Sequence, residues 1–271
     1  MTRSTLTPAT PAPSTPTRSP LARSTVTATS VWLRRFHPAE DAPVRLFCFP
    51  HAGGSASYYF PVSRALSPDA DVLAVQYPGR QDRRHERCVD DLHELADRVV
   101  AELRPWLDRP VALFGHSLGA SLAFEVARRM EAAGDPAPVA LFASGRRAPS
   151  RPRENQLVHL APDEQLLARI KGMNGTDPAV LADDELLRSV LPAIRGDYKA
   201  AETYRYRPGP ALTSPITVLT GDSDPEVTAE EAAAWADHTV GRFALRRFPG
   251  GHFYLNEHVA EVIGLIRGEL A

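Results

Sequence analysis

Cysteine, lysine and long hydrophobic runs are scarce in this chain of 271 residues. The two cysteines, Cys48 and Cys88, form neither a disulfide framework nor a metal-ligand pattern, so we expect free thiols in the reducing cytoplasm. Lysine occurs only at Lys171 and Lys199, and a net charge of −2 gives no overall field that points to nucleic acid. No apolar run approaches the length of a membrane span. These absences predict a soluble protein with neither a nucleic-acid nor a membrane partner, and we expect a monomer.

Residues 1–30 have no acidic side chain and no apolar periodicity. They hold fourteen Ser or Thr, five Pro and three Arg, a composition that cannot bury enough surface to offset the entropy of ordering. The segment lacks the continuous apolar core of a secretory signal, although its composition also resembles that of an organellar transit peptide. We interpret it as a disordered tail and assign residues 31–271 to one domain, because the length and the 43% hydrophobic content suit one large α/β domain.

Short apolar runs alternate with helical segments over most of the chain. Strands are predicted at residues 44–49, 71–75, 111–114, 139–143, 216–220 and 243–248, and helices near residues 91–107, 117–133, 229–237 and 257–270. Strands that alternate with helices form a mostly parallel sheet covered on both faces. The runs at residues 32–36 and 44–49 are expected to form an antiparallel edge of this sheet. The predicted fold class is therefore α/β.

The alternation stops over residues 146–212, where no β-like run occurs. Pro162-Asp163-Glu164 and Asp183-Asp184-Glu185 place acidic residues at helix starts, and an apolar stripe follows each of them. An insertion of this length between two strands predicts a helical lid over the C-terminal edge of the sheet. A helical patch that merely covers an exposed sheet edge is the alternative.

The segment Gly115-His116-Ser117-Leu118-Gly119 lies between an apolar run and a helix-like run. Strand, Gly-x-Ser-x-Gly and helix in this order are the context of a nucleophile elbow. A serine on such a tight turn adopts a strained backbone, and glycines two residues before and after it avoid a collision. Ser117 is therefore the predicted nucleophile, and the Leu118 amide at the helix N-terminus is a predicted oxyanion donor.

A serine nucleophile needs a base, and in this architecture the chain order is Ser, acid, His. His252 follows a predicted strand through Pro249-Gly250-Gly251, whose glycines let the backbone swing a side chain over the sheet edge. His159 precedes every candidate acid loop, whereas His238 and His258 fall in helical runs. We therefore predict His252 as the base.

The acid that orients the base is expected in Gly221-Asp222-Ser223-Asp224-Pro225, directly after a predicted strand. Two aspartates compete there, and one of them is expected to hold a turn or cap a helix. Asp224 lies farther from the strand end and is better able to curl toward the His252 loop. We predict Asp224 as the acid and keep Asp222 as the alternative.

The second oxyanion donor is expected in the loop Phe49-Pro50-His51-Ala52-Gly53-Gly54-Ser55, because glycines let main-chain N–H groups approach a substrate oxygen. Ala52 is the predicted donor and Gly53 the next candidate. We interpret His51 as a brace of this loop through a backbone hydrogen bond rather than as a second base. A simple glycine turn is the alternative.

Five segments, taken together and in this order, resemble the discrete type II thioesterases that accompany polyketide synthases and non-ribosomal peptide synthetases. They are Phe49-Pro50-His51-Ala52-Gly53-Gly54-Ser55, Tyr77-Pro78-Gly79-Arg80, Gly115-His116-Ser117-Leu118-Gly119, Gly221-Asp222-Ser223-Asp224-Pro225 and Gly250-Gly251-His252-Phe253. The elbow alone is typical of any α/β-hydrolase. The first glycine loop and the Tyr77–Arg80 turn narrow the resemblance to this family.

The resemblance implies an α/β-hydrolase fold and an enzyme that cleaves acyl thioesters from the phosphopantetheine arm of acyl or peptidyl carrier proteins, which clears stalled or mis-primed chains. It implies Ser117, Asp224 and His252 as the triad and Ala52 and Leu118 as the oxyanion donors. Such chemistry needs no metal or organic cofactor. The alternatives are a carrier-independent esterase or acyltransferase, a chain-releasing thioesterase domain, and a catalytically silent binding protein.

Two groups of arginines follow predicted strands and should emerge near the sheet edge of Ser117. They are Arg80, Arg83 and Arg84, and Arg146, Arg147, Arg151 and Arg153. If the resemblance holds, they are candidates to bind a phosphopantetheine phosphate or an acidic carrier-protein helix. A solvated arginine-rich surface is an equally good interpretation in a chain with so little lysine.

Overall fold

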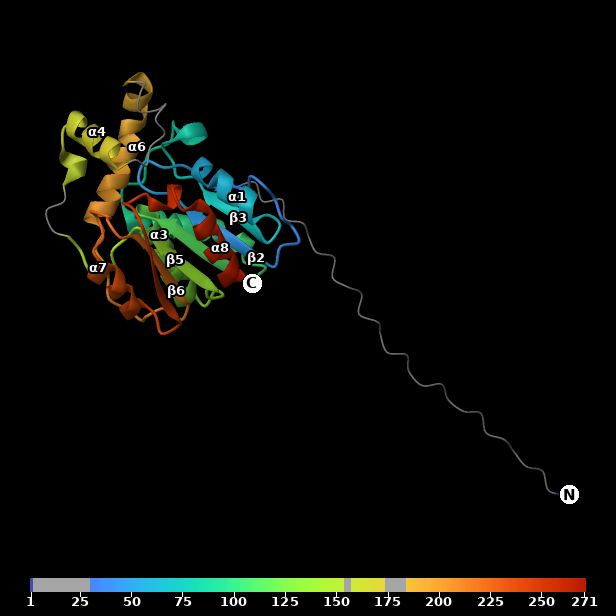
Figure 1. Cartoon of the computed structure of the whole chain (residues 1–271). Helices are drawn as coiled ribbons and strands as arrows, with labels where there is room; N and C mark the ends of the chain where they lie inside the picture. Colours follow the sequence, from blue (N-terminus) through green and yellow to red (C-terminus); the bar gives the residue numbers. More distant parts are fainter. Residues whose placement is uncertain (2–29, 154–156, 174–183) are drawn as a thin grey trace.

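The structure is a computed structural model that describes residues 1, 30–153, 157–173 and 184–271 (Figure 1). The tail expected at residues 1–30 lies outside the described residues except for its two end positions, as do parts of the lid expected at residues 146–212. In the described ranges no helix is long and apolar enough to cross a membrane.

A seven-stranded sheet forms the centre of the described chain. Its strands are β1 (Leu33–Arg34), β2 (Val44–Phe49), β3 (Ala70–Val75), β4 (Val111–His116), β5 (Ala140–Ser144), β6 (Ile216–Gly221) and β7 (Phe243–Phe248). The order is β1-β3-β2-β4-β5-β6-β7, and every pairing except that of β1 with β3 is parallel. The predicted, mostly parallel α/β sheet is thus confirmed.

The antiparallel edge differs from the expectation. Only β1 runs antiparallel, with Leu33 opposite Val75 of β3. β2 lies inside the sheet, parallel to β3 and β4, so the prediction that residues 44–49 belong to the antiparallel edge was wrong. All six residues of β2 are buried, which is typical of a strand covered on both faces.

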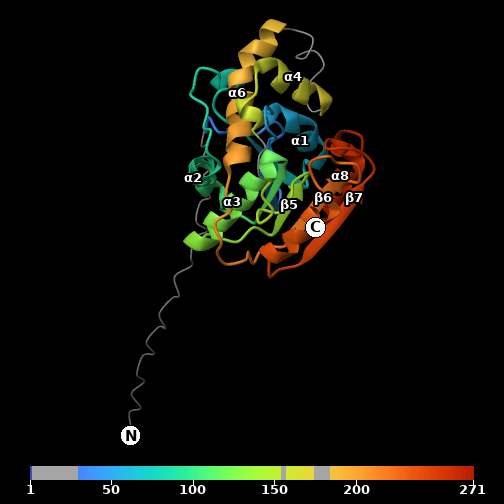
Figure 2. The ribbon, with the colours of Figure 1, turned by 90° about the vertical axis from the view of Figure 1, so that its left-hand side faces the viewer.

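Helices cover both faces of the sheet (Figures 1 and 2). They are α1 (Phe60–Leu66), α2 (Leu92–Leu103), α3 (Leu118–Ala133), α4 (Asp163–Gly172), α6 (Asp184–Thr203), α7 (Ala229–Ala233) and α8 (Val259–Leu270). Because strand side chains alternate, Leu46 and Cys48 of β2 pack in the cluster that includes α1 and α8. Phe47 and Phe49 pack in the opposite cluster with α2 and α3.

A change in the direction of strand addition positions the site. β2 and β4 are neighbours in the sheet, but the helix after β2 lies on one face and the helix after β4 lies on the other. The connections leaving the two strands therefore diverge, and a crevice opens at their carboxyl ends. The glycine loop follows β2 and the Gly115–Gly119 elbow follows β4, so the topology brings these two segments together.

α4 and α6, here called the lid helices, stand between β5 and β6 in the chain and lie beyond the sheet in both views (Figures 1 and 2). α4 begins at Asp163, as the acidic helix start predicts. Leu166 and Ile170 of α4 pack against Leu191 and Ile194 of α6 in a small apolar cluster. This cluster joins the two lid helices to each other.

Candidate active site

Ser117 stands on a strained turn between β4 and α3. Its backbone angles, φ of 54° and ψ of −116°, lie in a region that residues other than glycine rarely adopt. Its N–H donates to the Ser144 carbonyl at 2.8 Å. A Cβ on Gly115 would lie 2.1 Å from the Gly119 carbonyl oxygen, and one on Gly119 would lie 2.0 Å from the Phe49 carbonyl oxygen. Both glycines are therefore required by close backbone packing.

His252 and Asp224 face each other in the interior. Nδ1 of His252 lies 2.9 Å from Oδ2 and 3.1 Å from Oδ1 of Asp224, and both side chains are buried. The Asp224 carboxylate also accepts the Glu226 N–H at 2.8 Å, which holds it in place. A carboxylate at Nδ1 keeps the ring proton on that nitrogen and leaves Nε2 as the basic atom.

Asp222 occupies a different place. Its Oδ1 accepts the Ser223 hydroxyl at 2.9 Å and the Gly250 N–H at 3.0 Å, and its side chain is exposed. Asp222 thus ties its own turn to the loop that precedes His252. Of the two aspartates that competed in the sequence, the structure brings Asp224 against the histidine and Asp222 against the backbone.

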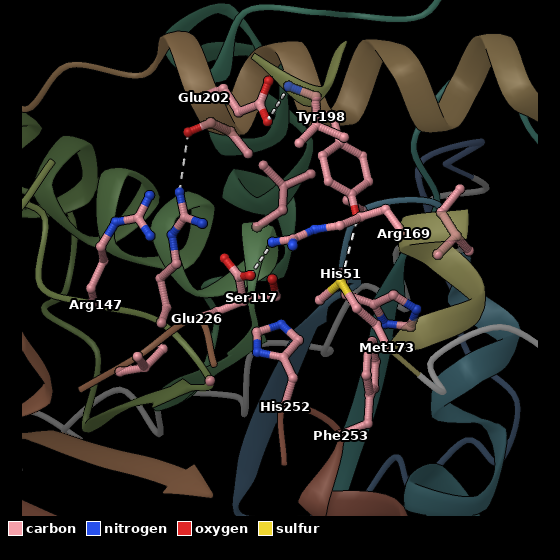
Figure 3. A pocket seen from close by; sticks show the side chains of 18 residues that line it. His51, Ser117, Arg147, Arg169, Met173, Tyr198, Glu202, Glu226, His252 and Phe253 are labelled. Carbon is pink, nitrogen blue, oxygen red and sulfur yellow. Dashed lines mark hydrogen bonds and ion pairs between the residues drawn. The ribbon is translucent and has the colours of Figure 1, made fainter. Parts of the chain in front are cut away.

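Ser117 and His252 line one pocket of about 790 Å³, measured out to its open mouth (Figure 3). Nε2 of His252 is buried and has no hydrogen-bond partner in the described chain, so the bond to the Ser117 hydroxyl is not formed in this structure. Such catalytic hydrogen bonds are often long without substrate and tighten when it binds.

The two expected oxyanion donors, Ala52 and Leu118, line the same pocket. Leu118 is the first residue of α3, where an amide has no acceptor within its own helix. Gly53, the other candidate of the glycine loop, donates its N–H to Oδ2 of Asp197 at 2.7 Å. Its amide is engaged by the lid helix α6, which favours Ala52 as the donor from this loop.

The Tyr77–Arg80 turn holds the glycine loop in place through hydrogen bonds to its carbonyl groups. The Tyr77 hydroxyl donates to the Pro50 carbonyl at 3.0 Å, and the Arg80 guanidinium donates to the Gly54 carbonyl at 3.1 Å. Arg80 also forms a two-pronged, buried ion pair with Asp197, at 2.6 and 2.8 Å. Sequence reasoning missed Asp197, because nothing around this position in a 20-residue helix distinguishes it.

Two arginines of the first group, Arg80 and Arg83, are buried and present no cationic surface. Arg80 is committed to Asp197, and buried Arg83 pairs with Glu86 at 2.6 Å and donates to the Gln76 carbonyl at 2.7 Å. These two side chains are therefore not presented to a phosphate or an acidic helix in this structure, whereas Arg84 of the same group is exposed. The guanidinium groups of Arg80 and Arg83 instead stabilise the turn through these contacts.

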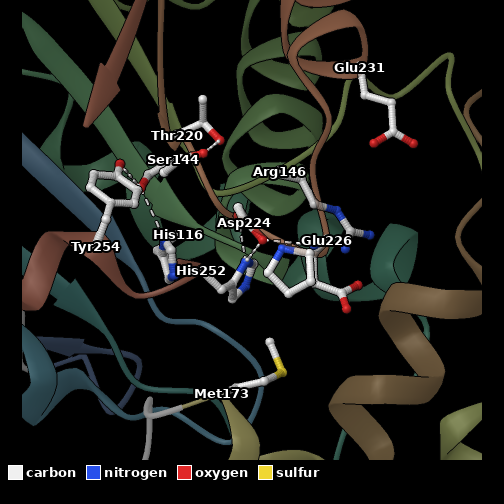
Figure 4. A network of polar contacts seen from close by, with 12 residues as sticks. His116, Ser144, Arg146, Met173, Thr220, Asp224, Glu226, Glu231, His252 and Tyr254 are labelled. Atoms are coloured by element: carbon white, nitrogen blue, oxygen red, sulfur yellow. Dashed lines mark hydrogen bonds and ion pairs between the residues drawn. The ribbon is translucent and has the colours of Figure 1, made fainter. Parts of the chain in front are cut away.

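A buried polar network lies beside His252 (Figure 4). His116 Nδ1 contacts the Ser144 hydroxyl at 2.9 Å, and that hydroxyl contacts the Tyr254 hydroxyl at 2.7 Å. The rings of His116 and His252 are 5.0 Å apart between centroids. Burial, and then the proximity of His252 and His51, lower the pKa of His116 well below its usual value, so this imidazole is neutral. The Gly-x-Ser-x-Gly pattern assigns no role to its second residue and does not reveal this network.

Residues of α4, of α6 and of the loop that holds Asp224 line the pocket beside Ser117. Arg169 of α4 forms an ion pair with Glu226, two residues after Asp224, and Figure 3 shows this pair across the pocket from His252. The Tyr198 hydroxyl donates to the Met173 sulfur at 3.5 Å on the same side. In the ranges that the structure covers, no group of three or more His, Cys, Asp or Glu side chains is arranged to hold a metal ion.

The chain is similar in sequence and in structure to known thioesterases. A family model described as a thioesterase domain matches residues 44–270. Thioesterase PikA5 of Streptomyces venezuelae is 53% identical over 243 residues, which cover 89% of this chain and 86% of that protein. The solved structure of the type II thioesterase BorB from the borrelidin biosynthetic cluster is 56% identical, with a TM-score of 0.86 over 90% of this chain and 100% of the other. The RedJ thioesterase of Streptomyces coelicolor, from the prodiginine biosynthetic pathway, is 36% identical, with a TM-score of 0.80 over 86% and 88%.

Proposed function

The chain belongs to the thioesterase family, and on that premise we propose that Ser117, His252 and Asp224 hydrolyse acyl thioesters carried on phosphopantetheinyl carrier proteins. The chain is an α/β-hydrolase and a serine hydrolase of the thioesterase class. The contact between His252 Nδ1 and Asp224 beside Ser117 is the observation that carries the proposal.

In the acylation step, Ser117 Oγ attacks the thioester carbonyl while His252 Nε2 takes the hydroxyl proton. Asp224 stabilises the imidazolium, and the Leu118 and Ala52 amides stabilise the oxyanion of the tetrahedral intermediate. The carbon–sulfur bond then breaks, and His252 returns the proton to the leaving thiolate. The product is an acyl ester on Ser117 and the free thiol of the carrier arm.

Deacylation repeats the sequence with water as the nucleophile. His252 takes a proton from the water as it attacks the acyl ester, and the same two amides hold the new oxyanion. The bond to Ser117 Oγ breaks, His252 returns a proton to that oxygen, and the carboxylic acid leaves. The neutral His116 next to His252 adds no second positive charge when the imidazolium forms, which supports His252 as the base.

The relatives named above are two thioesterases and one type II thioesterase, and two of the three come from a biosynthetic cluster or pathway, which supports acyl or peptidyl carrier proteins as partners. We propose that the enzyme edits polyketide or non-ribosomal peptide assembly by removing acyl groups that block a carrier. We further propose that it acts as a monomer in the cytoplasm, with residues 1–30 as a tail and α4 and α6 as part of a lid.

The test compares hydrolysis of one acyl group presented on a carrier protein, on coenzyme A and as a simple ester, with Ser117→Ala as the matched control. We expect the highest kcat/KM on the carrier protein and loss of all hydrolysis in Ser117→Ala. A preference for simple esters would replace the proposal with a carrier-independent esterase. Wild-type rates in Ser117→Ala would remove the assignment of the nucleophile.

A further inference from the structure

A second cavity, of about 330 Å³ measured to its open mouth, adjoins the active-site pocket. The two cavities share Arg146, Arg147, Ala201 and Glu202. Its lining is dominated by arginines, which are Arg146, Arg147, Arg151, Arg153 and Arg205. A concave site with this charge favours an anionic ligand.

Arg146 lines both this arginine-lined cavity and the pocket of the nucleophile. Nε of Arg146 donates to the Ser121 hydroxyl at 2.9 Å, and Ser121 also lines the cavity. Ser121 lies four residues after Ser117, in the first turn of α3, which corresponds to a rise of about 6 Å along a helix. Burial, and then the charge of Arg147, lower the pKa of Arg146 to about 10, so Arg146 still carries its positive charge at neutral pH.

Two of the arginines that line this cavity, Arg151 and Arg205, are exposed to solvent. In the described ranges no carboxylate lies within ion-pair distance of Arg151. Arg205 donates from one nitrogen to the Glu202 and Tyr204 carbonyls, at 2.8 and 2.9 Å, which orients its guanidinium fork without neutralising it. Arg153 differs, because Glu231 pairs with it at 2.9 and 3.1 Å.

Glu202 is the one carboxylate among the described residues that line this cavity, and it would oppose an anion. Its oxygens already accept the Val158 and His159 N–H groups, at 3.0 and 3.1 Å, and also contact Nδ1 of His159. These donors disperse its negative charge. The balance of charge along the cavity therefore remains positive.

We propose that Arg151 and Arg205 bind the phosphate of the phosphopantetheine arm, and that the arm runs along this cavity past Arg146 to Ser117. The inference rests on the proposed function. The arm has one anionic group, and it lies at the end away from the thioester. A positively charged cavity that adjoins the pocket of the nucleophile and is lined by two exposed arginines matches this order of groups.

The test uses two synthetic substrates with the same acyl group, one on pantetheine and one on 4′-phosphopantetheine. The measured quantity is the ratio of their kcat/KM values. In the wild type we expect the phosphate to raise kcat/KM about tenfold, the size of one or two charge-assisted hydrogen bonds. In the double variant Arg151→Ala/Arg205→Ala the ratio should fall to about one, and in Arg151→Lys/Arg205→Lys it should be intermediate.

Arg246→Ala is the matched control, because Arg246 is an exposed arginine on β7 and lines neither cavity. Its ratio should equal that of the wild type. An unchanged ratio in the double alanine variant would overturn the inference. A third substrate, the same acyl group on a carrier protein, is measured alongside, and a loss confined to it would also overturn the inference because it would indicate binding of an acidic carrier surface. If the wild type hydrolysed the carrier-protein substrate but neither small substrate, the inference would fail and the proposed function would stand; if it hydrolysed none of the three, the proposed function would fail and the inference with it.

Discussion

The Asp197 carboxylate joins Arg80 to the glycine loop. Oδ2 of Asp197 accepts both Arg80 Nη1 at 2.6 Å and the Gly53 N–H at 2.7 Å, and both side chains are buried. Asp197 lies on lid helix α6, 117 residues from Arg80 in the chain. The position of the lid and the geometry of the glycine loop are therefore coupled through this ion pair.

Replacing Asp197 by Asn should impair both stability and catalysis. Asn keeps an acceptor for Gly53 but leaves the Arg80 charge buried without its partner, a loss of about 3 kcal/mol in the free energy of unfolding. We expect kcat to fall by about tenfold or more, because the Ala52 amide moves with the loop. Urea unfolding and steady-state kinetics measure the two effects.

A boronic acid that forms a tetrahedral adduct with Ser117 separates a positioning role of Asp197 from a purely structural one. If Asp197 positions the glycine loop, Asp197→Asn and Asp197→Ala should each lower the affinity for the boronate by about the same factor as kcat/KM. Reduced stability with unchanged kcat and unchanged boronate affinity would contradict the coupling.

The two aspartates of the acid loop should respond differently to the same change. Asp224→Asn should lower kcat by about 10³- to 10⁴-fold, because an amide favours the wrong tautomer of His252 and does not stabilise its charged form. Asp222→Asn touches only the turn at Gly250 and should cost less than about tenfold, the scale of one hydrogen bond. Equal losses in the two variants would argue against Asp224 as the triad acid.

Buried His116 should make the fold less stable below neutral pH, because it binds a proton only in the unfolded chain. Its pKa is lowered in the folded chain from 6.5, so the unfolded chain binds a proton that the folded chain does not. Stability then falls as the pH drops below about 6.5, by up to about 1.4 kcal/mol per pH unit for this one proton. His116→Gln should remove this share of the slope between about pH 5 and 6.5, while part of it persists because burial also lowers the pKa of His238.

Urea unfolding across this pH range measures the slope, and His85→Gln is the control because His85 is exposed. The slope of the control should match the wild type. If His116→Gln also matched it, buried His116 would not be the group that couples stability to pH.

The Arg169–Glu226 ion pair should restrict bulky acyl groups. Arg169→Gln removes the charge contact between α4 and the acid loop, and an exposed pair of this kind contributes up to about 1 kcal/mol. We expect kcat/KM for large acyl groups to rise by about threefold, with little change for small ones. High salt should reduce the difference between variant and wild type. An equal change for all acyl lengths would show that the pair does not restrict acyl size.

Two glycines in helices should give opposite results when replaced by alanine. Gly119→Ala forces a Cβ against the Phe49 and Pro50 carbonyl oxygens, at 2.0 and 2.8 Å, so the elbow must shift and both stability and activity should be lost. Gly264→Ala on α8 meets nothing within 4 Å and should stabilise the fold by about 0.5–1 kcal/mol. Thermal unfolding measures both, and an active Gly119→Ala enzyme would show that the elbow tolerates a side chain.

The order of strands and helices and the Ser117 turn follow from local rules, which act over a few neighbouring residues. An apolar run, two glycines and a helix start suffice to predict the elbow, because its backbone geometry excludes side chains at two flanking positions. The chain order also places the His252 loop after the aspartate loop. Residues 44–49, however, are apolar except for Arg45, a pattern that indicates a buried strand but not which strands lie beside it.

Sequence alone thus determined the parallel α/β class, the turn at Ser117 and the candidates for its partners. Tertiary structure alone decided which aspartate meets His252, which strand forms the antiparallel edge, and which arginines are consumed by ion pairs. The physical reason is distance along the chain. Contacts such as Arg80 with Asp197 depend on how α6 packs over the sheet, and no local pattern encodes that packing.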